Sequence, residues 1–181
     1  AMAILAALVQ RGRTGQGQLV EVAMQEAVLN LTRVKFTGTL ATGKPLERSG
    51  NRSATGGYSD LIRCAGSGVN DYVYIIVPPD NPEMFQAAME VIGRPELKDD
   101  ERFNSAAARA RNGAALTEVL ESWTRPREKH DVMKAFAGRG IVCGAVLDTS
   151  EVLRDPHLRE RGTIVDIDHP TRGRFSTIIS P

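Results

Sequence analysis

Residues 4–31 read ILAALVQRGRTGQGQLVEVAMQEAVLNL: an apolar run, a glycine-containing turn and a second apolar pattern. The run from Ala1 to Val9 is apolar almost all round, which is typical of a helix that is buried on every side. After the turn, alternating apolar residues at 19–24 predict a short strand, and a spacing near 3.6 over 25–40 predicts a helix. A helix, a strand and a further helix in this order indicate an α/β fold. Because the chain opens inside the apolar pattern, we expect Ala1–Val9 to belong to a core helix of a longer protein.

The composition excludes several classes of protein. The chain has 23 Lys and Arg against 22 Asp and Glu, which gives a formal net charge of +1. It therefore lacks the overall excess of positive charge that is typical of nucleic-acid-binding proteins. No apolar stretch approaches the roughly 20 residues that span a bilayer. The two cysteines, Cys64 and Cys143, lack CxxC spacing and indicate reduced thiols. We therefore expect these 181 residues to belong to a cytoplasmic protein with no nucleic-acid partner and no membrane partner.

The rest of the chain alternates between strand and helix patterns. Asn81 followed by Pro82 predicts a helix start, and Asp148 with Glu151 predicts a capping box. The strands at 60–64 and 72–77 are expected to form an antiparallel hairpin, and so are the last two strands. Expected strands are 60–64, 72–77, 142–147, 163–168 and 174–179; expected helices are 82–92, 105–123, 127–137 and 149–155.

Three groups of side chains have a chemical and an ordinary interpretation. Cys143 could be a thiol nucleophile beside a histidine, but its position inside an apolar strand favours a buried small hydrophobe, and Cys64 is interpreted in the same way. Asp166, Asp168 and His169 are the nearest approach to a metal site, although alternation puts the histidine on the other face of the strand. Arginines interspersed with acidic residues, namely Arg102, Arg109, Arg111, Arg154, Arg159 and Arg161, are expected on solvated helix faces.

Residues 41–57 break all periodicity and form a linker or a functional loop. Within them, residues 50–57 read GNRSATGG, and the glycines permit close approach of the backbone to a ligand. Arg48 and Arg52 could meet an anion there. A solvated linker between domains explains the same residues equally well, so both interpretations stay open at this point.

The order of these segments resembles that of the family III CoA-transferases, the group of formyl-CoA:oxalate CoA-transferase, carnitine CoA-transferase and the bile acid-inducible protein F. The similar segments span nearly the whole chain. They are R-x-x-T-G-x-G-Q at 11–18, V-x-V-x-M at 20–24, R-x-G-N at 48–51, a strand at 140–146, D-P-H at 155–157 and H-P-x-x-G at 169–173. The chain departs from the family pattern where Val142 and Ala145 replace prolines, and where residues 53–57 lack a continuous glycine run. The second departure leaves the acyl specificity open.

The resemblance implies a domain organisation. Residues 1–47 would be the exit of a Rossmann-like large domain with a connecting helix. Residues 48–160 would form a smaller α+β domain, and residues 161–181 would return toward the large domain. Relatives form interlocked homodimers, and we expect the same of the intact protein. An isolated chain would expose the apolar face of Met2–Val9.

The resemblance also implies an activity, the transfer of CoA between carboxylic acids through aspartyl anhydrides and an enzyme–CoA thioester. The partners would be acyl-CoA and a small carboxylic acid, with coenzyme A as a substrate, no permanently bound cofactor and no metal. The family's nucleophilic aspartate lies just upstream of the core helix. No acidic residue occurs in the first twenty positions, so we expect this chain to lack the catalytic residue and to be inactive alone.

Two sets of site residues follow from the resemblance. Met24 and Gln25 match a position near the bound CoA, although Met24 is equally compatible with ordinary core packing. An active-site loop would consist of Ser53, Ala54, Thr55, Gly56, Gly57 and Tyr58, and its backbone N–H groups would stabilise an oxyanion. The alternative function is a non-catalytic binding or interaction module on the same fold.

Overall fold

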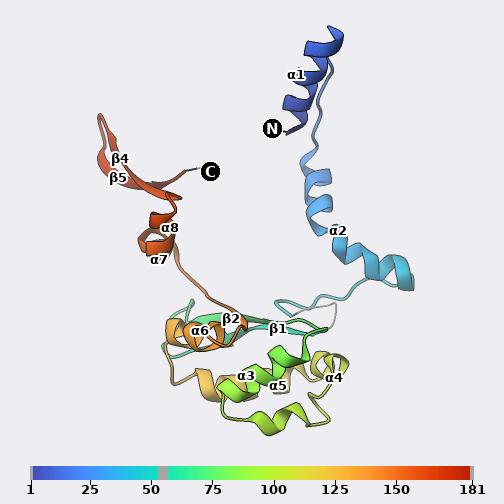
Figure 1. Cartoon of the computed structure of the whole chain (residues 1–181), viewed down its shortest axis with the longest axis vertical. Coiled ribbons are helices and arrows are strands. Elements are labelled where there is room, and N and C mark those ends of the chain that lie inside the picture. The colour runs from blue at the N-terminus through green and yellow to red at the C-terminus, as the bar shows by residue number, and fades with distance from the viewer. Residues whose placement is uncertain (1, 53–56, 180–181) are drawn as a thin grey trace. The chain divides into compact units, whose positions relative to one another are not determined.

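The computed structural model describes residues 2–52 and 57–179 (Figure 1). The elements fall into two compact units, residues 1–48 and residues 49–181. Helices and strands both contribute to the described chain, so the expected mixed α/β class is confirmed. The domain boundaries expected after residues 47 and 160 remain predictions.

The first unit consists of two helices, α1 (Met2–Thr14) and α2 (Met24–Thr42). The predicted strand at 19–24 is wrong: residues 16–23 form no regular structure, and Met24 is the first residue of α2. An alternating pattern needs a neighbouring strand to pair its backbone N–H and C=O groups, and the described part of this unit contains none. Gly43 ends α2 at a φ of +67°, with its N–H donating to the carbonyl of Thr39.

Apolar side chains of the first unit face solvent within this chain. Neither α1 nor α2 contains a buried residue among those described. Met2 is 86% exposed and Leu31 is 82% exposed. Within the first unit, the burial expected for Ala1–Val9 is therefore not observed at the described residues Met2–Val9. No described helix is both long enough and apolar enough to cross a membrane.

The second unit is built on a three-stranded antiparallel sheet in the order β1 (Tyr58–Arg63), β2 (Tyr72–Val77), β3 (Val142–Ala145). The predicted hairpin is confirmed, with Ser59 opposite Ile76, although β1 begins two residues earlier than expected. Burial alternates along β2, where Val73, Ile75 and Val77 face the core.

Helices cover the buried face of this sheet. They are α3 (Pro82–Val91), a 3₁₀ helix (Pro95–Lys98), α4 (Ala106–Arg111), α5 (Gly113–Thr124) and α6 (Lys129–Ala137). α5 packs on β1, and α6 packs on β2 and β3. The start of α3 is confirmed, because Asn81 Oδ1 accepts the Met84 N–H at 2.9 Å. The predicted single helix over 105–123 is wrong, since Asn112 ends α4 with its side-chain amide on the Ala108 carbonyl.

The core of the second unit joins the sheet to these helices. Its fully buried side chains come mainly from β1, β2, α3, α5 and α6, together with Phe103 from the turn before α4. The largest are Phe103, Phe136, Ile62, Ile75, Met89, Leu116 and Leu120. The rings of Trp123 and Phe136 meet edge to face at 5.6 Å between their centroids. This core fixes the position of α5 on β1, and these two elements carry the residues of the candidate site.

The remaining elements are α7 (Thr149–Arg154), α8 (Pro156–Glu160), β4 (Ile164–His169) and β5 (Gly173–Ile178). The capping box of α7 is confirmed, and the predicted last hairpin is confirmed as β4–β5. α8 was not expected, although Asp155 and Pro156 are good starting residues for a helix: Asp155 Oδ1 accepts the Leu158 N–H at 3.0 Å.

Candidate functional site

The two residues of the predicted loop that the structure describes are Gly57 and Tyr58; Ser53, Ala54, Thr55 and Gly56 lie outside the described residues. Gly57 is buried at a φ of +74°. A Cβ at this position would lie 2.6 Å from the Val77 carbonyl oxygen and 2.9 Å from the Pro79 nitrogen. The backbone at Val77 and Pro79 therefore approaches Gly57 so closely that a Cβ at position 57 would force it to shift.

Tyr58 is anchored in the core immediately after Gly57. Its side chain is 3% exposed, and its hydroxyl lies 2.8 Å from Oγ1 of Thr117 on α5. Thr117 Oγ1 also lies 3.0 Å from Oδ2 of Asp60. Burial raises the pKa of the Tyr58 phenol far above its ordinary value, so the phenol is neutral and available as a hydrogen-bond donor.

Arg52, on the other side of residues 53–56, is tied to the same carboxylate. Its Nε donates to Asp60 Oδ2 at 3.0 Å. Its backbone is held by Ser49, whose hydroxyl donates to the Arg52 carbonyl at 2.8 Å. The neighbouring Asn51 carbonyl accepts the hydroxyl of Tyr74 from β2 at 3.0 Å. Asp60 thus connects both flanks of residues 53–56.

A buried arginine lies beside these residues. Arg109 is 2% exposed, which contradicts its expected place on a solvated helix face. It packs over the Phe85 ring at 4.6 Å and donates from Nη1 to the Phe103 carbonyl at 2.9 Å. Its Nε finds no partner among the described residues, and burial lowers the pKa of the guanidinium. The small recess there is lined by Arg52, Gly57, Tyr58, Ser59, Arg109, Ala110 and Gly113.

Met24 and Gln25 belong to the first unit, at the beginning of α2. Met24 is 87% exposed, so it takes no part in a core within the first unit. A contact between these two residues and CoA stays a prediction.

The two cysteines are not poised for nucleophilic chemistry. Cys64 is 2% exposed, and burial raises its pKa to about 11. Cys143 on β3 packs partly buried against the core, and burial, with a smaller contribution from Cys64, raises its pKa to about 12. The interpretation of Cys64 as a buried small residue is confirmed. For Cys143 the same interpretation is confirmed in part, because its side chain is only partly buried. Neither thiol has the lowered pKa that a catalytic thiolate needs.

Asp166 takes part in an ion-pair cluster on the β4–β5 hairpin. It accepts hydrogen bonds from Ser176 Oγ at 2.6 Å and Arg174 Nη2 at 3.1 Å, with Arg159 Nη1 at 3.4 Å. The hydrogen bond from Ser176 and those from the arginines hold the pKa of this carboxyl below its usual value. In the described ranges, no three His, Cys, Asp or Glu side chains are grouped as a metal site would require.

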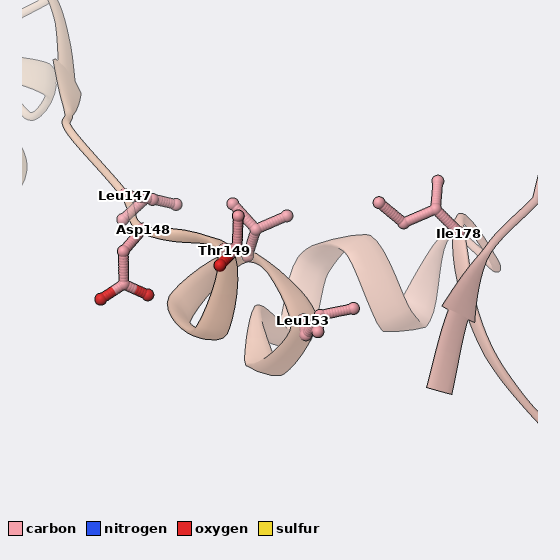
Figure 2. Close-up of a pocket in the computed structure, with 6 residues that line it drawn as sticks. Leu147, Asp148, Thr149, Leu153 and Ile178 are labelled. Carbon is pink, nitrogen blue, oxygen red and sulfur yellow. The ribbon is translucent and has the colours of Figure 1, made fainter. Parts of the chain in front are cut away.

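A larger and mainly apolar cavity of about 230 Å³ lies between α7 and β5 (Figure 2). Its lining residues are Leu147, Asp148, Thr149, Val152, Leu153 and Ile178. In Figure 2 the carboxylate of Asp148 points away from Ile178. Asp148 Oδ1 accepts the backbone N–H of Glu151 at 2.7 Å, so this carboxylate serves the helix cap. The cavity offers aliphatic surface and no evident catalytic group.

Asp60 and Thr117 are absent from the site residues that the sequence predicts. Asp60 lies two residues after Tyr58, on the same face of β1, and this alternation is a local signal that could have found it. Thr117 carries no such signal, because its partner Tyr58 lies 59 positions away.

The described features define a class of protein: a mixed α/β chain in which Gly57 and Tyr58 are held between a small antiparallel sheet and the helix packed on it. The profile of CoA-transferase family III matches residues 1–181. The chain belongs to this family.

Relatives and solved structures agree with that assignment. Formyl-CoA:oxalate CoA-transferases from Streptomyces avermitilis and Bradyrhizobium diazoefficiens are 40% identical over 191 residues and 32% identical over 200 residues. These alignments cover 98% and 100% of this chain but 46% of each relative, so the chain spans about half the length of the curated relatives it matches.

Two solved structures have the same fold. A CAIB/BAIF family protein from Brucella suis superimposes with a TM-score of 0.70 at 28% identity, covering 99% of this chain and 49% of that chain. Rv3272 from Mycobacterium tuberculosis superimposes with a TM-score of 0.75 at 24% identity, covering 99% of this chain and 45% of that chain. The second likeness shows the fold alone.

Proposed function

We propose that this chain contributes to a CoA-transferase that moves CoA from an acyl-CoA to a carboxylic acid, with formyl-CoA and oxalate as the first pair to test. The observation that carries the proposal is the family match over residues 1–181, together with 40% identity to a formyl-CoA:oxalate CoA-transferase. CoA enters and leaves as part of the substrates, so it is not a resident cofactor.

The proposed chemistry uses an aspartate as a covalent nucleophile. Its carboxylate attacks the thioester carbonyl of the donor, which forms a mixed anhydride and releases CoA as a thiolate. The thiolate attacks the aspartyl carbonyl of the anhydride, releases the donor acid as a carboxylate and leaves an enzyme–CoA thioester. The acceptor carboxylate then displaces the thiolate to form a second anhydride. Attack of the thiolate on the acceptor carbonyl yields the new acyl-CoA and regenerates the aspartate.

The nucleophile is proposed to lie outside residues 1–181. Residues 4–18 resemble the core helix and turn that follow it, and the first acidic residue of the chain is Glu21. The 181-residue chain assayed alone should therefore show no turnover. Measured transfer by the purified chain would contradict this part of the proposal.

Gly57 and Tyr58 are proposed to present backbone to the reacting acyl group, where N–H groups stabilise the oxyanion of each tetrahedral intermediate. The close approach of Gly57 to Val77 and the burial of Tyr58 support this role, because preorganised donors need a rigid frame. Met24 and Gln25 are proposed to lie near CoA, and the exposure of Met24 leaves it available for contact.

The same protein is proposed to act as a cytoplasmic homodimer. The two free cysteines support a reducing compartment. The apolar side chains that α1 and α2 expose support association with a second copy; they include Met2, Leu5, Leu8, Val9, Val28, Leu31, Val34 and Leu40. Sedimentation equilibrium of the 181-residue chain, alone and within the longest open reading frame that contains it, tests the assembly.

The activity is tested with the product of that longest open reading frame. Incubation with formyl-CoA and isotope-labelled oxalate should yield labelled oxalyl-CoA, detected by liquid chromatography and mass spectrometry. Intact-protein mass spectrometry with the donor alone should show a covalent adduct that maps to an aspartate. CoA binding without turnover or adduct would favour the non-catalytic binding module instead. A panel of other acyl-CoAs then identifies the donor class.

A further inference from the structure

We propose that Thr117 is a positioning residue. Its hydroxyl contacts Tyr58 directly and Arg52 through Asp60, and it thereby fixes these two residues, which flank residues 53–56, against β1 and α5. This inference rests on the transferase function proposed above. It assigns a role to a side chain of α5, which lies outside the predicted loop.

The direction of the hydrogen bonds follows from counting protons. The Thr117 hydroxyl has one proton, and its two acceptors are Asp60 Oδ2 at 3.0 Å and the Gly113 carbonyl at 2.9 Å. Whichever acceptor takes that proton, the contact of 2.8 Å with Tyr58 requires the phenol to donate. Tyr58 therefore donates to Thr117, and Thr117 donates to Asp60 Oδ2, because a carboxylate oxygen is a stronger acceptor than a backbone carbonyl.

Asp60 joins this chain of hydrogen bonds to Arg52. Oδ2 of Asp60 accepts from both Thr117 Oγ1 and Arg52 Nε, each at 3.0 Å. Oδ1 accepts the Leu61 N–H at 2.9 Å, and the Asp60 side chain is 13% exposed. Because both oxygens are used and water has little access, the carboxylate cannot easily replace a lost partner.

The first turn of α5 supplies the surface for Arg52. The Cδ of Arg52 lies 3.8 Å from the position that a Cβ on Gly113 would occupy. The arginine stem therefore lies on the start of the helix whose next turn carries Thr117. Arg52 on one flank and Tyr58 on the other thus contact the same segment of α5, residues 113–117.

Removal of the Thr117 hydroxyl should make the positions of Arg52 and Tyr58 less fixed without leaving a cavity in the core. Thr117→Val keeps the size and branching of the side chain, but it leaves the Tyr58 phenol and Asp60 Oδ2 each short of a partner. Thr117→Ser retains the hydroxyl and should restore the network. A displacement of about 1 Å at reacting groups costs up to roughly 100-fold in rate, so the effect should appear in kcat.

Thr124 provides a matched control on the same helix. It is fully buried, and its Oγ1 donates to the Arg63 carbonyl at 2.5 Å, at the far end of β1. Thr124→Val removes an equivalent bond between α5 and β1, at a site away from residues 53–56. Both valine variants should lose stability, because each leaves a buried polar group of β1 without its partner on α5.

The first measurement is steady-state CoA transfer by the product of the longest open reading frame that contains the chain. In Thr117→Val, kcat should fall by about 10- to 100-fold with KM for the acyl-CoA changed by less than about threefold. The fraction of donor lost to hydrolysis should rise. Thr117→Ser and Thr124→Val should stay within about threefold of the unsubstituted protein in kcat. Equal losses in both valine variants, or no rescue by serine, would overturn the positioning role.

The second measurement separates this inference from the proposed function. Amide hydrogen exchange of the 181-residue chain should show faster exchange at Tyr58–Asp60 in Thr117→Val and unchanged exchange there in Thr124→Val. Absence of transfer by the unsubstituted protein refutes the proposed function and leaves this comparison to decide the positioning role. Unchanged exchange at Tyr58–Asp60 in Thr117→Val overturns the role whatever the transfer assay gives.

Discussion

The ammonium group of Lys129 lies 2.7 Å from Oε1 of Glu151 and joins the first turn of α6 to the first turn of α7. The same ammonium donates to the Val146 carbonyl at 2.8 Å, and its side chain is 10% exposed. Glu151 Oε2 accepts the Asp148 N–H at 2.8 Å, which is half of the capping box. One carboxylate therefore caps α7 and ties it to the helix packed under the sheet.

Glu151→Gln should weaken this link in a pH-dependent way. The hydrogen bond from Lys129 lowers the pKa of Glu151 below its ordinary value of 4.5. Its ionised form therefore contributes stability above that value and loses it as the pH falls through the lowered pKa. Glutamine can keep the capping bond with its single oxygen, but it removes the charge and places an NH2 donor where an oxygen accepts from Lys129. Thermal unfolding followed by circular dichroism should show a lower Tm for Glu151→Gln at pH 7 and a difference that shrinks below about pH 4. A difference that is constant with pH would exclude the charge as its source.

Gly57→Ala should destabilise the second unit more than the same change at Gly140. Both glycines have a φ of +74°, so both alanines bear the left-handed backbone penalty of about 1–2 kcal/mol. Only at Gly57 does the new Cβ meet backbone, at 2.6 Å from the Val77 oxygen, whereas nothing lies within 4 Å at Gly140. Urea unfolding should give a loss at Gly57 larger by at least about 1 kcal/mol. Equal losses would show that β2 yields to the added methyl group.

The thiols of Cys64 and Cys143 should react slowly in the folded chain. Burial raises their pKa values to about 11 and about 12, so the thiolate is scarce at pH 8. Labelling by a thiol reagent at pH 8 should be at least about 100-fold slower than in the urea-unfolded chain. Because the folded state holds these protons more tightly, stability should also fall as the pH rises from about 9 toward 12. Rapid labelling of Cys143 alone in the folded chain would revive the thiol-nucleophile alternative.

Phe136→Ala should remove much of the stability of the second unit. The ring is fully buried and meets Trp123 edge to face, so its loss leaves a cavity and should cost about 3–5 kcal/mol. Trp123 is the single tryptophan, so its fluorescence reports the unfolding of this unit directly. Phe136→Leu should cost about 1.5 kcal/mol or less and remain measurable if the alanine variant does not fold. Phe175→Ala, at a ring 38% exposed on β5, serves as the control and should change stability by less than about 1 kcal/mol.

Elements with a strong local signal are predicted well. Asn81 begins α3, Asp148 and Glu151 cap α7, and the expected hairpin over 60–77 is observed as β1 and β2. Each of these features depends on contacts within a few residues or on alternation along one strand. The strand expected at 19–24 fails because alternation alone cannot supply a neighbouring strand. The break between α4 and α5 depends on an amide of Asn112 that could also have faced solvent.

The segment order alone carries the family relationship, which the match over residues 1–181 confirms, and it singles out Gly57 and Tyr58 as loop residues. The residues that contact Gly57 and Tyr58 are determined by tertiary packing. Thr117 contacts Tyr58 across 59 positions and Asp60 across 57, and Arg109 becomes buried with its guanidinium over the Phe85 ring. The sequence around Thr117 shows only the pattern of an amphipathic helix. A hydrogen-bond partner in a strand far away in the sequence does not alter that local pattern. The chain thus encodes locally where several of its helices begin, whereas the hydrogen-bonded frame around Gly57 and Tyr58 exists only once α5 packs on β1 and excludes water from their contact.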